Sequence, residues 1–386
     1  MSWSFVPLGD HINILSGFAF KSDLFNTAGD GLPLVRIRDV VSGVSETYYS
    51  GEYSNEYLVQ NGDMLIGMDG DFNREKWSGG KALLNQRVCK VTAKADTLDQ
   101  SYLYHFLPKA LTKIHAATPA VTVKHLSVKG IRSIEIPLPP LTEQKRIAAI
   151  LDKADAIRRK RQQAIQLADD FLRSVFLDMF GDPVTNPKGW EEQPLHNLAD
   201  IRSGVTKGKK VDLDKSETLP YMRVANVQDG YLDLSDIKQI VVSKTDAKKY
   251  VLKRGDLLLT EGGDPDKLGR GYVWDGEIEN CLHQNHIFAV RIKSSKTNLI
   301  RPQFLSATVG SLRGKRYFLK VGKQTTGIAT INKTVLSEFP ALVPPIKLQD
   351  EYIAICNKIF ALKDTYAQGD LDLMQSCQKT LFSNGL

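Results

Sequence analysis

An internal repeat constrains the fold of this chain more than any other feature of its sequence. With Trp3 set against Trp190, an offset of 187, 11 of the 41 positions from 3 to 43 are identical without a gap. Average residue frequencies would give about two or three. The identities include Pro7-Leu8 with Pro194-Leu195, Ser16-Gly17 with Ser203-Gly204, Leu32-Pro33 with Leu219-Pro220, and Arg36 with Arg223. The sequence therefore predicts two similar domains.

The repeat continues beyond this stretch with small changes of length. Gly62-Asp63 and Gly255-Asp256 each precede an apolar run, which is typical of a turn that enters a buried strand. Gln86 matches Gln284, and Pro139-Pro140 matches Pro344-Pro345, with a long helical pattern after each proline pair. The order along the chain is domain, helix, domain, helix. This order favours two binding surfaces that the helices hold at a fixed separation. The alternative is a tandem duplication without functional meaning.

The first long helix is expected over Thr142–Phe180, about 58 Å at 1.5 Å per residue. Thr142 is a good N-cap residue, and Gly181-Asp182-Pro183 stops the helix. The second helix is expected from about Lys347 to Phe382. The expected domain limits are therefore 1–141 and 182–345 for the two domains, with helical segments at 142–181 and 346–386.

Both helical patterns carry apolar residues at near-heptad spacing, which predicts that each helix has a partner. The residues expected at the interface are Ile147, Ile150, Ile157 and Phe171 in the first helix and Ile355, Ile359, Leu362 and Tyr366 in the second. An antiparallel coiled coil between them would separate the domains and give a pseudo-twofold repeat. The alternative is two unrelated amphipathic helices, each on its own domain. The basic run 158–161 could face DNA, a partner or solvent.

Length and composition set the broad class of the protein. A chain of 386 residues that is 42% hydrophobic favours two or three globular domains. The net charge of +7 permits a nucleic-acid partner without requiring one. The four cysteines form no C-x-x-C pair, so a zinc site is not expected and a reduced, cytoplasmic setting is. The first residues do not resemble a secretory signal, and no apolar run is long enough to cross a membrane.

Motifs for catalysis and cofactor binding are missing from the sequence. The glycine-rich stretches 204–210 and 310–316 have the wrong spacing for a phosphate-binding loop, and no dinucleotide fingerprint follows a strand. The two proline pairs lack the flanking residues of an adenine methyltransferase motif. The seven histidines form no zinc-protease motif, and His283 and His286 are expected to be structural. The chain is therefore not expected to be an enzyme.

Two loops at equivalent places are the first candidates for contact with DNA. The loop at 68–80 carries Arg74, Lys76 and Trp77, and the loop at 260–271 carries Lys267 and Arg270. The loops differ strongly although their flanks match, as expected of two domains that recognise different targets. Unconstrained drift of surface loops is the alternative.

Further candidates combine positive charge with hydrogen-bonding groups. They are the cationic loop with Lys207, Lys209 and Lys210, the stretch Lys323, Gln324, Thr325 and Thr326, and its first-domain counterpart with Thr122 and Lys124. Amines suit phosphates, and an amide can pair with adenine. Arg36 and Arg223 lie at equivalent places, which suggests a shared phosphate or base contact, with a structural salt bridge as an equal alternative.

The segment from Pro137 to Ile147, PLPPLTEQKRI, leads into the first long helix. It resembles the specificity (S) subunit of Type I restriction–modification enzymes, as does the whole layout of two half-repeats and two helices. The second copy departs from the pattern, because Leu348 replaces the glutamate that precedes the glutamine. That departure leaves subunit docking at this end open. The first domain also lacks a glycine-rich counterpart of 323–327.

The resemblance implies an α/β fold of two target recognition domains separated by an antiparallel two-helix coiled coil. Each domain would recognise half of a bipartite DNA site, and the helices would set the spacer and dock modification (M) subunits. S-adenosylmethionine, ATP and Mg²⁺ would bind the M and restriction (R) subunits and not this chain. The competing classes are a coiled-coil scaffold for protein ligands and, less favoured, a self-sufficient methyltransferase or nuclease.

Overall fold

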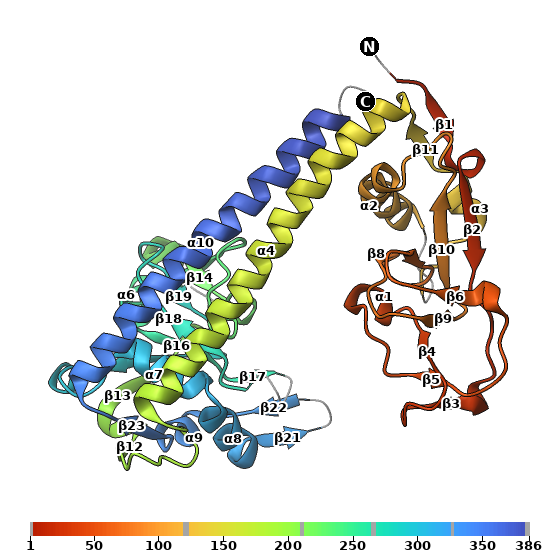
Figure 1. The fold of residues 1–386 in the computed structure, drawn as a ribbon. Coiled ribbons are helices and arrows are strands. Elements are labelled where there is room, and N and C mark those ends of the chain that lie inside the picture. Colours follow the sequence, from red (N-terminus) through yellow and green to blue (C-terminus); the bar gives the residue numbers. More distant parts are fainter. Residues whose placement is uncertain (1–2, 119–122, 209–211, 264–267, 326–327, 383–386) are drawn as a thin grey trace. The chain divides into compact units, whose positions relative to one another are not determined.

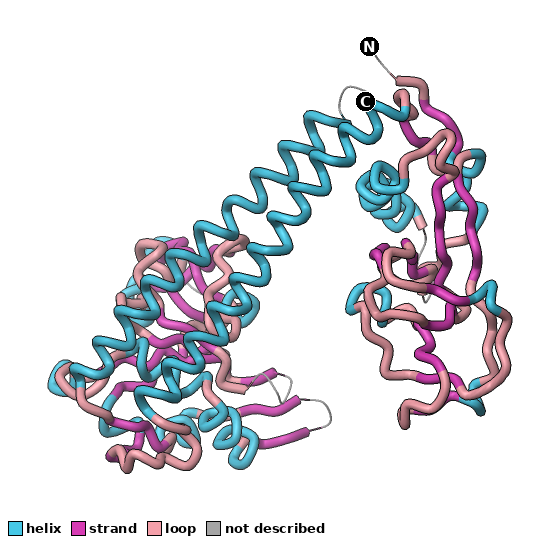
Figure 2. Tube along the Cα trace, in the orientation of Figure 1, coloured by secondary structure: helices cyan, strands magenta, loops and turns pink. Residues whose placement is uncertain are grey.

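The computed structural model describes residues 3–118, 123–208, 212–263, 268–325 and 328–382. It separates into two compact units, one formed by residues 1–163 with 366–386 and one formed by residues 164–365. The two long helices, α4 (Leu141–Phe180) and α10 (Ile346–Phe382), each contribute to both units. Figures 1 and 2 show helices and strands mixed in both units.

The first unit is built on a four-stranded antiparallel sheet with the order β2-β10-β7-β8. A second sheet, β3-β5-β4-β9-β6, and the pair β1-β11 accompany it. The bounds are β1 (Phe5–Pro7), β2 (Ile12–Ser16), β3 (Phe25–Asn26), β4 (Leu32–Val35), α1 (Asp39–Ser42), β5 (Tyr48–Tyr49), β6 (Leu58–Val59), β7 (Met64–Gly67), β8 (Arg74–Lys76), β9 (Ala82–Leu84), β10 (Val88–Ala93), α2 (Gln100–Ala117), α3 (Val128–Arg132) and β11 (Glu135–Pro137).

Side chains of the four-stranded sheet alternate between two apolar clusters, as the pleat of a strand requires. In β7, Met64 and Ile66 face a cluster that includes α2 and the start of α4. Leu65, between them, faces a cluster built around Trp77 and Val35. The sheet is therefore covered on both faces, which explains why β7 is a continuous apolar run.

The second unit repeats this plan with the sheet β13-β20-β16-β18, the sheet β15-β14-β19 and the pair β12-β23. A small sheet, β17-β22-β21, is added. The bounds are β12 (Glu191–Pro194), α5 (Leu195–Leu198), β13 (Ala199–Ser203), β14 (Ser216–Met222), β15 (Lys238–Ser243), α6 (Lys244–Tyr250), β16 (Leu257–Thr260), β17 (Gly262–Gly263), β18 (Gly271–Val273), β19 (Leu282–His283), β20 (Ile287–Ile292), α7 (Pro302–Gly310), α8 (Leu312–Val321), β21 (Lys323–Thr325), β22 (Ile328–Thr330), α9 (Lys333–Ser337) and β23 (Pro340–Val343).

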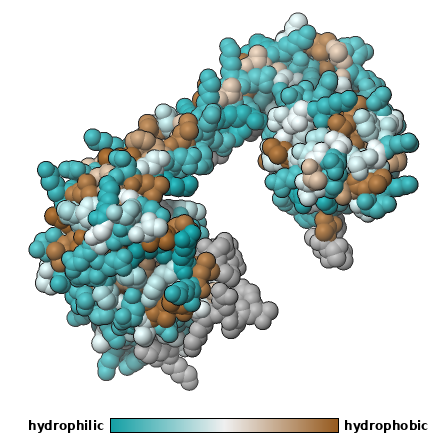
Figure 3. Space-filling view, turned by 60° about the horizontal axis from the view of Figure 1, so that its bottom comes forward, coloured by the Kyte–Doolittle hydropathy of each residue, from teal (hydrophilic) through white to brown (hydrophobic). Residues whose placement is uncertain are grey.

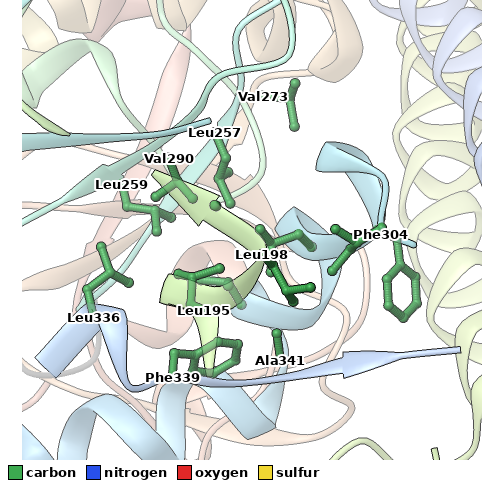
Figure 4. Close-up of a cluster of buried hydrophobic side chains, with 14 of the residues drawn as sticks. Leu195, Leu198, Leu257, Leu259, Val273, Val290, Phe304, Leu336, Phe339 and Ala341 are labelled. Atoms are coloured by element: carbon green, nitrogen blue, oxygen red, sulfur yellow. The ribbon is translucent and has the colours of Figure 1, made fainter. Parts of the chain in front are cut away.

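The largest core cluster of the second unit lies between its sheet and its helices. Figure 4 shows Leu257, Leu259 and Val290 of the sheet near Leu198 and Phe304. The cluster continues into both long helices through Phe176 and Phe180 of α4 and Tyr352 of α10. The helices are thus part of the hydrophobic core of this unit rather than separate rods.

The strand registers of the two units correspond residue by residue. In the first unit β4 pairs with β9 in parallel, Val35 opposite Leu84, and in the second β14 pairs with β19 in parallel, Met222 opposite His283. The numbers of equivalent residues therefore differ by 187 between β4 and β14 and by 199 between β9 and β19. Gln284 therefore corresponds to Asn85 and not to Gln86, which corrects the alignment suggested by the sequence. The insertion lies between the two strands.

Two equivalent glycines allow the backbone to pass close to the next strand. A Cβ atom on Gly17 would lie 2.0 Å from the carbonyl oxygen of Asn85, and one on Gly204 would lie 1.9 Å from that of His283. No side chain fits at such a distance, so both positions require glycine. This explains why the Ser-Gly pair is identical in the two halves.

Two buried glutamines, here called the anchor glutamines, join each long helix to its domain. The amide nitrogen of Gln144 donates to the carbonyls of Thr97 (3.1 Å) and Pro139 (2.8 Å), and its oxygen accepts from the Asp99 N–H (2.9 Å). The amide nitrogen of Gln349 donates to Leu299 (2.9 Å) and Pro344 (2.8 Å), and its oxygen accepts from the Arg301 N–H (2.9 Å). Both residues are 0% exposed. The same joint is therefore built twice.

Within the second unit, α4 and α10 pack against each other in antiparallel directions. Lys363 forms an ion pair with Asp169 (2.5 Å), whereas Tyr352, earlier in α10, contacts Phe176 and Phe180, later in α4. Of the interface residues predicted here, Ile355 and Ile359 are half-buried against the core, but Phe171 is 50% and Leu362 44% exposed.

The prediction for Phe171 was wrong because the buried row is the adjacent one: Leu172, Phe176 and Phe180. These residues are spaced by four and follow the 3.6-residue period of a straight helix on a globular core, not a heptad.

In the first unit the start of α4 also belongs to a domain core. Ile147, predicted at a helix–helix interface, is 0% exposed and packs with Ala148 and Leu151 against the sheet cluster. Ile150 is half-buried, and Ile157 is 43% exposed. Tyr366, near the end of the described side chains of α10, is half-buried. In the described residues, no helix combines the length and the apolar character that a membrane crossing needs.

Candidate nucleic-acid interface

The carboxyl ends of three strands meet at one edge of each unit. This edge is here called the strand-end edge. In the first unit it consists of Phe18, Arg36, Gln86 and Arg87, which follow β2, β4 and β9. In the second unit it consists of Val205, Arg223, Asn285 and His286. Parallel pairing brings these positions together, because the carboxyl ends of parallel strands lie on the same side. Polar side chains gather there without any spacing motif in the sequence.

Arg36 and Arg223 lie at equivalent places on these edges but differ in their partners. Arg36 is exposed, and its guanidinium has no hydrogen-bonding or ionic partner within the described residues. Arg223 donates to the carbonyl (2.8 Å) and the carboxylate (2.9 Å) of Asp236. Arg223 therefore forms the structural salt bridge that the sequence left open as the alternative to a DNA contact. The charge of Arg36 stays available for a phosphate or a base.

A charged cluster next to this edge in the first unit was not found from the sequence. The His125 imidazole lies 2.6 Å from Asp69 and 3.3 Å from Arg87, and Arg87 lies 3.6 Å from Asp69. The side chains of Arg87 and His125 are 56% and 48% exposed. Arg87 has φ = +72°, a left-handed conformation that is uncommon outside glycine. Its partners are 18 and 38 residues away, so no local pattern could have revealed the cluster.

The second unit carries a related pair at its own edge. His286, whose side chain is 57% exposed, lies 2.7 Å from a carboxylate oxygen of Glu261. Arg270, a predicted contact residue, is half-buried and its guanidinium lies 3.3 Å from the Gln228 side-chain oxygen. The two edges thus present different donors and acceptors on equivalent backbones.

In the first predicted loop, the three candidate contact residues are engaged within the unit. Trp77 is 2% exposed, and its indole N–H donates to the Gly80 carbonyl (2.7 Å), so it is a core residue and not a base-stacking one. Arg74 and Lys76 belong to β8 and lie over the Tyr104 ring, 3.4 Å and 4.7 Å from its centroid. Burial lowers the pKa of Arg74. The predicted role of these three residues in DNA contact is therefore not supported by their positions.

The structure describes some of the remaining residues that were predicted to contact DNA, and others lie outside its described part. Lys124 is half-buried and its ammonium donates to the His115 carbonyl (2.5 Å), and Lys207 is exposed. Lys323, Gln324 and Thr325 form β21, whose backbone pairs with β22. The predicted residues outside the described part of the chain are Thr122, Lys209, Lys210, Lys267 and Thr326.

The two histidines near β19 have different environments. His283 is 1% exposed and its ring nitrogen lies 3.2 Å from the Tyr250 carbonyl. Burial lowers the pKa of His283 to about 4, so its ring is neutral at pH 7. His286 lies at the strand-end edge instead. The expectation that His283 is structural agrees with its burial.

The basic run at 158–161 is partly engaged by acidic residues of the first unit. Arg158 and Arg159 both donate to the carboxylate of Asp155, at 2.7 Å and 2.8 Å. Arg159 also reaches Glu75 and Tyr104 at 2.9 Å and 3.0 Å. These two arginines therefore have structural partners, which argues against a freely solvated face.

Figure 3 shows hydrophilic residues over most of the face that it displays, with hydrophobic residues in separate small patches. Among the described side chains of the long helices, the exposed large apolar ones are Ile157, Leu167, Phe171, Leu177 and Leu362. The described residues contain no group of three or more His, Cys, Asp or Glu side chains that could hold a metal ion.

Comparison with a protein family gives a match over most of the chain. The model of the Type I restriction modification DNA specificity domain matches twice, over residues 1–167 and 187–368. The two matches fall on the two halves of the repeat.

Individual proteins show the same likeness. The specificity subunit of the Type I restriction enzyme EcoBI from Escherichia coli is 31% identical over 389 residues, which cover 94% of this chain and 80% of that protein. The EcoKI specificity subunit from Escherichia coli strain K12 is 22% identical, with coverage of 94% and 83%. The crystal structure of the S subunit from M. genitalium has a similar fold, with a TM-score of 0.57, 14% identity and coverage of 100% and 96%.

Proposed function

Because the chain belongs to the family of Type I restriction–modification specificity subunits, we propose that each of its two units recognises one half of a bipartite, asymmetric DNA target. Specificity subunits are non-catalytic components of their complexes, and this chain is one of them. The proposed functional domains are 1–141 and 182–345, with the helical segments 142–181 and 346–386 between and after them.

One observation carries this proposal: equivalent backbones present different polar side chains. Arg36 is exposed without a partner in the described residues, whereas the equivalent Arg223 pairs with Asp236. Arg87 pairs with Asp69, whereas the equivalent position in the second unit is a histidine, His286, that pairs with Glu261. A duplicated scaffold with unlike recognition groups suits two unlike half-sites. Half-sites on opposite strands and on the same DNA face, about one helical turn apart, would match a pseudo-twofold pair of units.

We assign the DNA contacts to the strand-end edges and to the cationic segments around them. Arg36, Arg87 and Lys207 are exposed cations that suit phosphates or guanines. The remaining candidates stay predictions from the sequence: Thr122, Lys124, Lys209, Lys210, Arg223, Lys267, Arg270, Lys323, Gln324, Thr325 and Thr326. Arg74 and Lys76 leave the set because both lie over the Tyr104 ring, and Trp77 leaves it because it is buried.

The long helices are proposed to form an antiparallel coiled coil that sets the spacer and docks two M subunits. The antiparallel packing of α4 and α10 in the second unit supports this role. Exposed Ile157, Leu167 and Phe171 offer apolar contact area on α4 for such a partner. M subunits would bring S-adenosylmethionine, and R subunits would bring ATP and Mg²⁺. All would act in the cytoplasm.

A domain exchange followed by methylation mapping tests this function. Replacement of residues 190–340 with the matching segment of another specificity subunit should change one half of the methylated motif and leave the other half and the spacer intact. Deletion of the gene should remove the whole bipartite motif from the host methylome. A methylome that is unchanged after deletion, or an exchange that alters both halves, would contradict the proposal.

A further inference from the structure

A polar network joins the body of the first domain to the middle of α4, beyond the anchor glutamine. It consists of Glu75 from β8, Tyr104 from α2, and Asp155 and Arg159 from α4, and is here called the Arg159 network. All four residues belong to the first unit. Arg159 lies 15 positions, or about 22 Å of helix, beyond Gln144. A contact this far from the joint restrains the angle between the domain and the helix with a long lever arm.

Each member of the network has more than one partner. The Tyr104 hydroxyl donates to Glu75 (2.5 Å) and accepts from the Arg159 guanidinium (3.0 Å). The same guanidinium donates to Glu75 (2.9 Å) and to Asp155 (2.8 Å). Burial raises the pKa of Tyr104 to about 12, so its hydroxyl keeps its proton. Although burial opposes it, hydrogen bonds from Tyr104 and Arg159 hold the pKa of Glu75 below its usual value.

A second set of contacts runs one helical turn closer to the anchor. The Asp152 carboxylate accepts from Ser101 (2.8 Å) and lies 2.9 Å from the buried His105 ring nitrogen. On the other side of the network the Arg74 guanidinium covers the Tyr104 ring. Three elements, β8, α2 and α4, are thus held together by polar side chains over two helical turns.

The second unit has an apolar contact at the matching place. By strand register Glu75 corresponds to Tyr272, because each lies opposite the central leucine of its neighbouring strand. Counting from the anchor glutamines, Asp155 corresponds to Phe360 and Arg159 to Asp364. Tyr272 and Phe360 pack edge to face, with ring centroids 6.4 Å apart. The repeated fold therefore accommodates either chemistry at this place.

We propose that Arg159, Glu75 and Tyr104 are positioning residues that fix the orientation of the first domain relative to α4, and thereby the spacer length accepted by the complex. This inference rests on the proposed DNA-recognition function. Two domains joined through one helix pair must hold their angles to keep half-sites in register, since one base pair turns the duplex by about a tenth of its 10–10.5 bp turn. Beyond the anchor, the contact between domain and helix is polar in the first unit and aromatic in the second.

The different chemistry makes the two orientations respond differently to salt. The Arg159 side chain is 50% exposed, and a 270 Å³ cavity beside the network, lined by Asn73, Thr112 and Arg158, opens to solvent. Ions therefore reach the network and screen it. The aromatic contact between Tyr272 and Phe360 has no such sensitivity, so at this place salt weakens the contact of the first unit more than that of the second.

The test measures spacer discrimination in the complex of the full chain with its M subunits, using the target found by methylation mapping. Duplexes with the natural spacer and with spacers one base pair longer or shorter are compared for methylation rate. Arg159→Ala should reduce the preference for the natural spacer about five- to tenfold, as expected for loss of a charge-assisted network. Glu75→Gln should reduce it less, and Arg159→Lys should restore part of it. The bases methylated in each half-site should not change.

Arg173→Ala is the matched control, because Arg173 lies on the same helix and, among the described residues, pairs only with Asp170, an i,i+3 neighbour at 3.8 Å. The double substitution Glu75→Tyr with Asp155→Phe builds the aromatic contact of the second unit into the first and should keep discrimination at high salt. Full discrimination by both Arg159→Ala and Glu75→Gln, with normal folding, would overturn the positioning role. A wild-type complex that does not discriminate spacers at all would instead contradict the proposed function.

Discussion

The anchor glutamines show what a single residue contributes and how far the sequence reveals it. Gln144 and Gln349 were visible as matched residues after the proline pairs. Their role was not visible, because their hydrogen-bond partners lie 45 to 50 residues away in the sequence. These partners are Thr97 and Asp99 for Gln144, and Leu299 and Arg301 for Gln349. Glu143, the residue before Gln144, forms an exposed ion pair with Arg146. Leu348, which takes its place before Gln349, packs against the core of the second unit. The buried amide, and not the variable residue before it, makes the joint.

Gln144→Met removes this amide at nearly constant volume and should destabilise the first unit by about 3 kcal/mol. The cost arises because the Asp99 N–H and two carbonyls would be left buried without partners. Urea denaturation of the purified chain measures it. Gln163→Met, at an exposed position of the same helix, should stay within about 0.5 kcal/mol of the parent. Equal stabilities of the two variants would rule out the anchoring role.

At the scale of elements, the long helices were easier to predict than the side chains that they bury. The stop before Gly181 follows from capping chemistry, because Gly181 adopts a positive φ of 79°. The start was predicted to within one residue but for the wrong reason: α4 begins at Leu141, directly after the proline pair, so Thr142 lies in the first turn and is not the N-cap. The choice between Phe171 and Leu172 for the buried row depends on Phe304 and Tyr352, which are distant in sequence. Heptad spacing alone could not decide it. The convergence of Arg36 and Arg87 was equally hidden, since it depends on the parallel pairing of β4 and β9.

An insertion of seven residues into α4 and a matching one into α10 should lengthen the DNA spacer by about three base pairs. Seven helical residues add about 10.5 Å, and a base pair rises about 3.4 Å. Both helices must change, because Asp169 and Lys363 pair across them. Methylation mapping in the host provides the readout, with both half-site sequences unchanged. A four-residue insertion in α4 alone breaks this pairing and serves as the control, for which loss of methylation is expected.

At the scale of the whole molecule, the mild net charge of +7 agrees with contacts concentrated at a few places rather than a broadly basic surface. Many of the cations already have partners: Arg223 pairs with Asp236, Arg254 with Asp275, and Arg291 with Asp256. Charge counting from the sequence could not separate these from Arg36. The two-part layout, by contrast, followed from the repeat, and the mixed α/β architecture was expected from the resemblance to the specificity-subunit family.

Arg36→Ala should lower the slope of log affinity against log salt by about one for DNA binding by the assembled complex. The reason is that its exposed guanidinium has no partner in the described part of the chain and is available for one phosphate. Filter binding at several KCl concentrations measures the slope. Arg254→Ala removes an arginine that is already paired with Asp275 and should leave the slope unchanged. An unchanged slope in both variants would remove Arg36 from the phosphate contacts.

The duplicated joint at Gln144 and Gln349 also bears on how such a gene can diversify. Both proline pairs, both amides and the backbone groups that they bind are alike, so a crossover placed there exchanges an entire recognition surface while every buried hydrogen bond at the breakpoint is re-formed. Recombination between related loci, or between the two halves of one gene, would then yield folded chimaeras at high frequency. A lineage could gain new DNA target sequences by exchanging domains, without the many point mutations needed to rebuild an interface.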